Sequence, residues 1–252
     1  MNITTAGEGD DLVVLHGWAL HSGVFDGIAD ALRERFRVHF VDLPGHGHNA
    51  HVPLADDIEA VADAVLDAVP GSAHWLGWSL GGTVSLAAAL KAPERVRKLV
   101  MVASTPRFVT DSGWPHAIAE EMVVKMAADL EADFHRTVQN FLALQVLGDA
   151  NAQGLLRELR EKLFAHGEPA RASLANGLRI LRNTDLLPRL GELESPLLAI
   201  MGSRDRLAPP AAGEALAERV PDGKAVTIPR CAHAPFISHR EVFLSLVSDF
   251  LG

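Results

Sequence analysis

WLGWSLGG, at residues 75–82, decides the fold that we expect for this chain. It contains the pattern G-x-S-x-G at 77–81, between an apolar run and the helix-like stretch TVSLAAALKA. Gly77 and Gly81 lack the side chains that would collide where a strand turns sharply into a helix. The Ser79 hydroxyl would then be exposed at a helix N-terminus, where amide groups favour developing negative charge. The pattern predicts a nucleophilic serine; the alternative is a glycine-rich turn with an incidental serine.

Short apolar runs alternate with amphipathic stretches on both sides of this turn. The runs are apolar throughout, which is typical of strands buried on both faces; they lie at 12–15, 38–41, 75–78, 99–103, 197–201 and 225–228. Residues 24–35 and 55–68 have apolar side chains at helical spacing. This order predicts an α/β fold with a mostly parallel central sheet flanked by helices.

The alternation stops over about 80 residues in the second half of the chain. Residues 110–188 contain helical patterns, clearest at 117–130 and 134–147, and no convincing strand. Strand-like runs resume at Pro196. We therefore expect a core formed by residues 1–109 and 189–252, with residues 110–188 inserted as a helical cap above the sheet.

Composition excludes several classes of partner. The net charge is −9, from 23 basic and 32 acidic residues, and such a surface repels nucleic acid and anionic lipid. The first residues lack the pattern of a signal peptide, and no apolar run is long enough to span a membrane. The single cysteine, Cys231, rules out an internal disulfide. We expect a cytoplasmic monomer that needs no cofactor.

A serine nucleophile needs a base, and the base needs an orienting acid. In this type of fold the chain order is serine, acid, histidine. Asp205 directly follows one predicted strand, and His233 follows the last one. Both therefore lie at the carboxyl ends of the strands, where open α/β sheets place ligands. We predict that Asp205 orients His233. The alternatives are a solvated acid between two arginines and an ordinary loop histidine.

Two amide groups are expected to stabilise the negative oxygen that forms during acyl transfer. One is the N–H of Leu80, the residue after the nucleophile, and the other is the N–H of Trp18 in the loop HGW at 16–18. The indole of Trp18 would also form a pocket wall; the alternative is a core aromatic side chain. Trp78, beside the nucleophile, is a second pocket candidate. His16 is expected to bind backbone groups across its turn.

Two further signals are discounted. PGHGHNAH, at 44–51, contains three histidines, but no cysteine lies nearby and no H-E-x-x-H pattern occurs, so we expect no metal. Cys231 lies two residues before His233 without a partnering motif, and we expect it to be inert.

With these residues identified, the chain resembles the BioH-type pimeloyl-[acyl-carrier protein] methyl ester carboxylesterases of biotin synthesis. The matching pieces are LHGW at 15–18, VDLPGHG at 41–47, WLGWSLGG at 75–82, PERVRKLVMVAS at 93–104, FHRTVQNFLALQ at 134–145 and AHAPFISH at 232–239. The resemblance places the family's triad on Ser79, Asp205 and His233. It places the substrate contacts on Trp18, Leu80 and the 141–145 segment, with Phe141, Leu142, Leu144 and Gln145.

The resemblance also implies a substrate and a partner. The substrate would be the methyl ester of a pimeloyl group on acyl carrier protein, and short-chain esters would also be split. The acidic carrier would dock on basic cap residues, for which Arg136 and Arg157 occupy matching positions. Asn140 and Gln153 stand where well-known members have arginine, which weakens the docking inference but not the chemistry. The alternative is that the basic cap residues are ordinary solvent-exposed side chains on helix faces.

Two other functions remain open on the sequence alone. One is a general short-chain carboxylesterase, or a hydrolase of carbon–carbon bonds, with the same three residues. The other is a non-catalytic ligand receptor on this scaffold, because such a protein can keep all three side chains.

Overall fold

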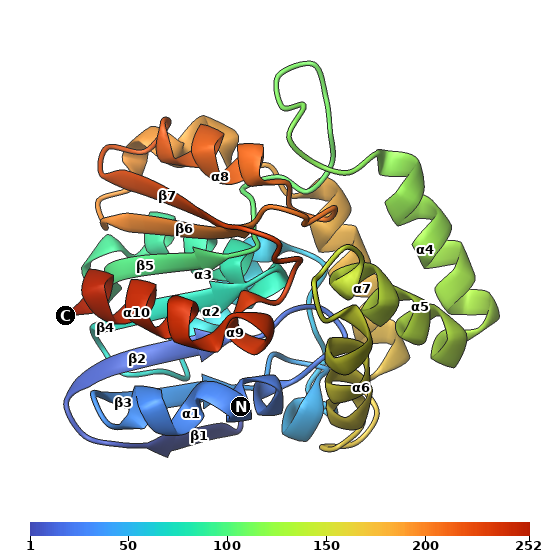
Figure 1. The fold of residues 1–252 in the computed structure, drawn as a ribbon, viewed down its shortest axis with the longest axis horizontal. Helices are drawn as coiled ribbons and strands as arrows, with labels where there is room; N and C mark the ends of the chain where they lie inside the picture. The colour runs from blue at the N-terminus through green and yellow to red at the C-terminus, as the bar shows by residue number, and fades with distance from the viewer.

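The computed structural model describes residues 1–252, built around one seven-stranded sheet (Figure 1). The spatial order is β1-β3-β2-β4-β5-β6-β7. The strands are β1 (Ile3–Ala6), β2 (Asp10–Leu15), β3 (Phe36–Val41), β4 (Ala73–Trp78), β5 (Val96–Val102), β6 (Leu197–Gly202) and β7 (Gly223–Ile228). Every neighbouring pair is parallel except β1 with β3, so the predicted mostly parallel sheet is confirmed.

The one strand that the sequence analysis did not predict is β1. Its four residues, ITTA, are only partly buried, so they carry no continuous apolar signal. Ile3 pairs with Val41 and Ala6 with Val38, and this pairing at the sheet edge defines the strand.

Helices cover both faces of the sheet. In Figure 1, α1 (Asp26–Arg33) and α10 (Arg240–Leu251) lie in front of it, whereas α2 (Ile58–Leu66) and α3 (Leu80–Lys91) lie behind. Two more core helices are α8 (Pro210–Ala217) and the short α9 (Pro235–Ser238). The central strand β4 and residues 80–90 of α3 are buried throughout. This central position makes the β4–α3 turn a rigid base for a functional side chain.

Four helices occupy the region between β5 and β6. They are α4 (Glu120–Ala132), α5 (Phe134–Val146), α6 (Ala152–Leu163) and α7 (Arg171–Asn183). Figure 1 shows them grouped beside one end of the sheet rather than on either face. The loop after β2 reaches them, because the indole nitrogen of Trp18 donates to the carbonyl of Leu174 in α7. The helices therefore cover the end of the sheet where β2, β4 and β6 finish. None of the helices in the protein has the length and apolarity needed to cross a bilayer.

Candidate active site

Ser79 is held in an unusual backbone conformation between β4 and α3. Its φ of 54° and ψ of −120° lie in a region that side chains other than glycine rarely adopt, at a cost of about 1–3 kcal/mol. A Cβ at Gly81 would lie 2.5 Å from the His16 carbonyl oxygen, and one at Gly77 would collide with the Gly81 carbonyl. The Ser79 N–H donates to Val102, and its carbonyl accepts from the Ser104 hydroxyl. These contacts hold the strained turn, which presents the serine at a helix N-terminus.

Asp205 and His233 are in direct contact. Nδ1 of His233 lies 2.7 Å from Oδ2 of Asp205, and both side chains are almost completely buried. The other carboxylate oxygen accepts the N–H groups of Leu207 and Ala208, at 2.8 and 3.1 Å. Because an ionised carboxylate can only accept, Nδ1 carries the proton and Nε2 keeps its lone pair. Nε2 is buried and has no hydrogen-bond partner in the protein, so the Ser79 hydroxyl does not bond it in this structure.

The backbone of His233 is fixed on both sides. Its N–H donates to the carbonyl of Gln145 at 3.0 Å, and its carbonyl accepts from Nε1 of Trp78 at 2.7 Å. The preceding N–H, of Ala232, donates to Oδ2 of Asp149 at 3.1 Å. Gln145 lies in the last turn of α5, and Asp149 follows this helix. The end of α5 therefore helps to position the histidine.

Sequence reasoning did not identify Asp149. Its Oδ1 accepts the N–H of Asn151, a local turn contact that the residue type favours. The contact with Ala232 joins residues 83 positions apart, and no local pattern predicts it. Arg204, next to Asp205, adds a parallel link by donating from Nη1 to the carbonyl of Gly148 at 2.8 Å. The loop after α5 thus contacts both the loop that carries Asp205 and the loop that carries His233.

The two backbone amides predicted to bind the negative oxygen are those of Leu80 and Trp18. Leu80 is the first residue of α3, so its N–H has no acceptor within the helix. The N–H of Trp18 forms no hydrogen bond in the protein. The loop that carries it passes close to the serine, since a Cβ at Gly17 would lie 3.1 Å from Cβ of Ser79.

His16 supports this loop and is not a second base. Its Nδ1 lies 2.8 Å from the Gly17 carbonyl, and its Nε2 accepts the N–H of Leu43 at 2.9 Å, as expected for a structural histidine. Complete burial, with His46 nearby, lowers the pKa of His16 to about 3, so the ring is neutral. Burial likewise raises the pKa of the Cys231 thiol to about 12, which keeps this thiol protonated and unreactive.

A narrow apolar cavity of about 20 Å³ lies against Ser79. Its other lining residues are all hydrophobic: Phe108, Ile118, Met122, Val123, Met126, Phe141, Leu144, Leu181 and Leu207. That volume holds about one water molecule, so an acyl chain requires these side chains to move. The unbranched side chains of Met122 and Met126 can do so at low cost. A second cavity, of about 150 Å³ between α4 and α5, is adjacent to the first, because both are lined by Met122, Met126, Phe141 and Leu144.

Several residues expected at the pocket have other positions. Trp78 is fully buried and does not line the cavity; its indole holds His233 and packs edge-on against Phe236. Leu142 is also fully buried and does not line the cavity, because its side chain points about 100° around α5 from that of Phe141. Leu80 is buried and does not line the cavity, and its N–H lies at the start of α3.

The remaining expected residues divide into cavity, wall and surface positions. Phe141 and Leu144 line the cavity. Trp18 forms a wall behind Phe141, with its ring edge-on at a centroid distance of 4.8 Å. Gln145 is buried and contributes its backbone carbonyl. Arg136 and Arg157 are exposed on α5 and α6, and neither forms an ion pair.

Comparisons with known proteins identify the family and the fold of this chain. A family model for the alpha/beta hydrolase fold matches residues 12–240. The chain is 47% identical to the pimeloyl-[acyl-carrier protein] methyl ester esterase of Xanthomonas campestris pv. campestris strain B100, covering 100% of this chain and 99% of that protein. It is 41% identical to the protein of the same name from Nitrosomonas europaea, covering 97% of each. An esterase structure from Exiguobacterium antarcticum superposes with a TM-score of 0.84 at 21% identity, over 99% of this chain and 95% of that one, which shows a shared fold.

Proposed function

The chain belongs to the α/β-hydrolase fold family and, within it, to the pimeloyl-[acyl-carrier protein] methyl ester esterases, and from this membership we propose that Ser79, His233 and Asp205 carry out its ester hydrolysis. The observation that carries this assignment is the buried contact between His233 and Asp205. It holds the imidazole in the tautomer whose free nitrogen is a base.

The proposed mechanism has two acyl-transfer steps. His233 takes the proton from the Ser79 hydroxyl as the oxygen attacks the ester carbonyl, and Asp205 stabilises the resulting imidazolium. The amides of Leu80 and Trp18 donate to the negative oxygen. His233 then gives its proton to the leaving alkoxide, and the alcohol departs. A water molecule, deprotonated by the same histidine, attacks the acyl-enzyme and releases the carboxylic acid.

We propose the pimeloyl methyl ester on acyl carrier protein as the physiological substrate. The curated relatives with this name match over almost their whole length. The cavity against Ser79 contains no charged side chain, which suits a neutral methyl ester and a methylene chain. A free carboxylate would lose its hydration there without gaining a cation, so the acid product would leave. Exposed Arg136 and Arg157 would meet the acidic carrier. The lone buried Cys231 fits a cytoplasmic site of action.

The nucleophile is tested by replacing Ser79 with alanine and measuring hydrolysis of p-nitrophenyl butyrate. We expect a loss of at least about a thousandfold in kcat, since residues of such a triad act as a unit. Ser245→Ala, an exposed hydroxyl on α10, is the control and should behave as wild type. A fluorophosphonate probe should label wild type and not Ser79→Ala. Turnover close to wild type in Ser79→Ala would refute the assignment, and an unlabelled, folded wild type would favour a receptor.

The substrate is tested separately with the carrier-linked methyl ester. Arg136→Glu and Arg157→Glu should lower kcat/KM for this ester by about tenfold at low salt and leave p-nitrophenyl butyrate hydrolysis unchanged. The wild-type gene should also restore growth without biotin to a strain lacking its own esterase. Failure of both results, with the small ester still hydrolysed, would favour a general short-chain esterase.

A further inference from the structure

Three histidines and a buried carboxylate meet where the α6–α7 connection contacts the core. The carboxylate is Asp42, which follows β3 and is 3% exposed. His21 and His48 lie in core loops after β2 and β3, and His166 lies in the connection from α6 to α7. Ligand atoms of His21, Asp42 and His166 are all within 4.8 Å of one another. The Ser79 site uses none of these four side chains.

The carboxylate is oriented toward the imidazole rings. Ser22 donates its N–H to Oδ1 of Asp42 at 2.7 Å, and His48 donates its N–H to Oδ2 at 2.9 Å. Oδ2 lies 3.1 Å from Nδ1 of His48 and 4.0 Å from Nδ1 of His166. Nδ1 of His166 is buried and has no hydrogen-bond partner. Nδ1 of His166 is therefore an unpaired nitrogen 4.0 Å from the buried carboxylate of Asp42.

The tautomer of His21 is also fixed. Its Nε2 lies 2.6 Å from the carbonyl oxygen of Lys162, and because a carbonyl can only accept, Nε2 carries the proton. Nδ1 therefore has the lone pair and accepts the N–H of Gly23 at 3.1 Å. A ring N–H directed to a backbone carbonyl is the usual support of a metal-binding histidine. Binding of a metal at Nδ1 would displace the Gly23 N–H from this nitrogen.

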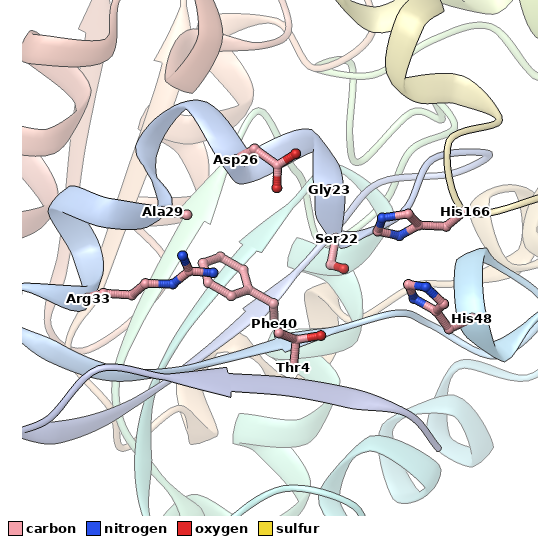
Figure 2. A pocket seen from close by; sticks show the side chains of 9 residues that line it. All are labelled: Thr4, Ser22, Gly23, Asp26, Ala29, Arg33, Phe40, His48 and His166. Atoms are coloured by element: carbon pink, nitrogen blue, oxygen red, sulfur yellow. The ribbon is translucent and has the colours of Figure 1, made fainter.

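Space for additional ligands lies next to the cluster. A cavity of about 250 Å³ is lined by Ser22, Gly23, His48 and His166, among others. Figure 2 shows His48 and His166 close together at one side of this cavity, with Ser22 beside them. The ring of His166 lies between those of His21 and His48, with centroid distances of 4.0 and 4.2 Å. His166 is partly exposed in an inter-helix connection, so its ring can turn to direct Nδ1 at a shared ion.

We propose that His21, Asp42 and His166 bind one divalent transition-metal ion of the Zn²⁺ class, with His48 or water as the fourth ligand. Imidazole nitrogens with one carboxylate suit Zn²⁺, Co²⁺ or Ni²⁺, whereas Mg²⁺ and Ca²⁺ prefer oxygen ligands. Binding needs nitrogens about 2.0–2.1 Å from the ion. The ligand atoms, which lie within 4.8 Å of one another, must therefore move closer together, and the stacked rings of His21 and His166 must turn toward the ion. The nearby ammonium of Lys162 is paired with Asp26 and so does not oppose the cation. The ion would join the α6–α7 connection to the core.

The test is metal binding by untagged, EDTA-treated protein near neutral pH. We expect one equivalent of Zn²⁺ by calorimetry and the visible absorption of tetrahedral Co²⁺. His166→Ala should lower the affinity by at least about tenfold, because it removes a ligand at a partly exposed site. His51→Ala is the matched control: this exposed histidine in the same histidine-rich stretch lies outside the cluster and should bind metal as wild type does.

A second measurement separates binding at this cluster from binding elsewhere. Zn²⁺ should raise the unfolding temperature of wild type and of His51→Ala, and at the same metal concentration should raise that of His166→Ala much less, because only native protein holds the assembled site. Circular dichroism establishes that His166→Ala is folded. No Co²⁺ spectrum at millimolar metal, or equal Zn²⁺ affinity and stabilisation in folded His166→Ala, would overturn the proposal.

Discussion

Replacing Asp149 with alanine removes the side chain by which the loop after α5 holds the histidine loop. Oδ2 of Asp149 accepts the N–H of Ala232 at 3.1 Å, and Oδ1 accepts the N–H of Asn151 at 2.9 Å. Asn151 is exposed, so water can replace the second contact. Ala232 is only 2% exposed, and its N–H would lose its partner inside the protein.

The size of the effect follows from that buried N–H. Leaving the buried N–H of Ala232 without an acceptor costs about 1–3 kcal/mol of free energy. The loop that carries Ala232 and His233 avoids this cost only if it moves. His233 follows directly, so the movement displaces the base from Ser79. At about 1.4 kcal/mol for each factor of ten in rate, we expect kcat to fall roughly 5- to 150-fold. KM for a small ester should change little, because Asp149 does not line the cavity against Ser79.

The assay is steady-state hydrolysis of p-nitrophenyl butyrate, with folding checked by thermal unfolding. Asp133→Ala is the matched control, because Asp133 caps the start of the same helix by accepting the N–H of Arg136 and contacts neither catalytic loop. It should cost about 1 kcal/mol of stability and leave kcat unchanged. Asp149→Asn, which keeps an acceptor for Ala232, should recover most of the activity. If Asp149→Ala stays within twofold of wild-type kcat, or Asp133→Ala loses as much, the proposed support of His233 is wrong.

Three other outcomes follow from the same structure. Trp78→Phe removes the N–H that binds the His233 carbonyl and should lower kcat by roughly tenfold, with an unchanged preference among ester lengths; a shift in that preference would mean that the indole lines the pocket. Phe141→Ala enlarges the cavity against Ser79 and should raise kcat/KM for p-nitrophenyl octanoate relative to butyrate, measured as a ratio; an unchanged ratio would place the acyl chain elsewhere. Burial lowers the pKa values of His16 and His46 from 6.5 to about 3 and about 4, so the unfolded chain binds protons that the folded protein does not. Above about pH 6.5 both rings are neutral whether the chain is folded or unfolded. As the pH falls below this value, the free energy of unfolding decreases by up to about 1.4 kcal/mol per pH unit for each histidine, until the pH reaches the folded-state pKa of about 3 for His16 and about 4 for His46. Urea unfolding at pH 5 and pH 7.5 measures it, and equal midpoints would show that the two rings are not buried in neutral form.

Local sequence determined most of the sheet and the position of the serine. The buried strands are recognisable because apolar runs bounded by turns need no distant partner to be identified. Gly77 and Gly81 are required by the turn itself, where a Cβ would meet backbone atoms a few residues away or at the end of the neighbouring strand. Ser79, Asp205 and His233 come after the parallel strands β4, β6 and β7, so all three lie at the carboxyl ends of the strands. Their order along the chain is the order that this fold predicts.

Only the folded chain decided how these groups are supported and covered. Trp78 has the same neighbours in sequence whether its indole faces substrate or holds His233, and the choice depends on a carbonyl 155 residues away. In the sequence, Asp149 has the features of an ordinary turn residue. Its contact with the N–H of Ala232 forms only because the end of α5 packs against the loop before α9. The cluster of His21, Asp42 and His166 assembles from three separate loops for the same reason. Sequence patterns record the period and turns of a segment, whereas contacts between distant segments depend on packing that no single segment specifies.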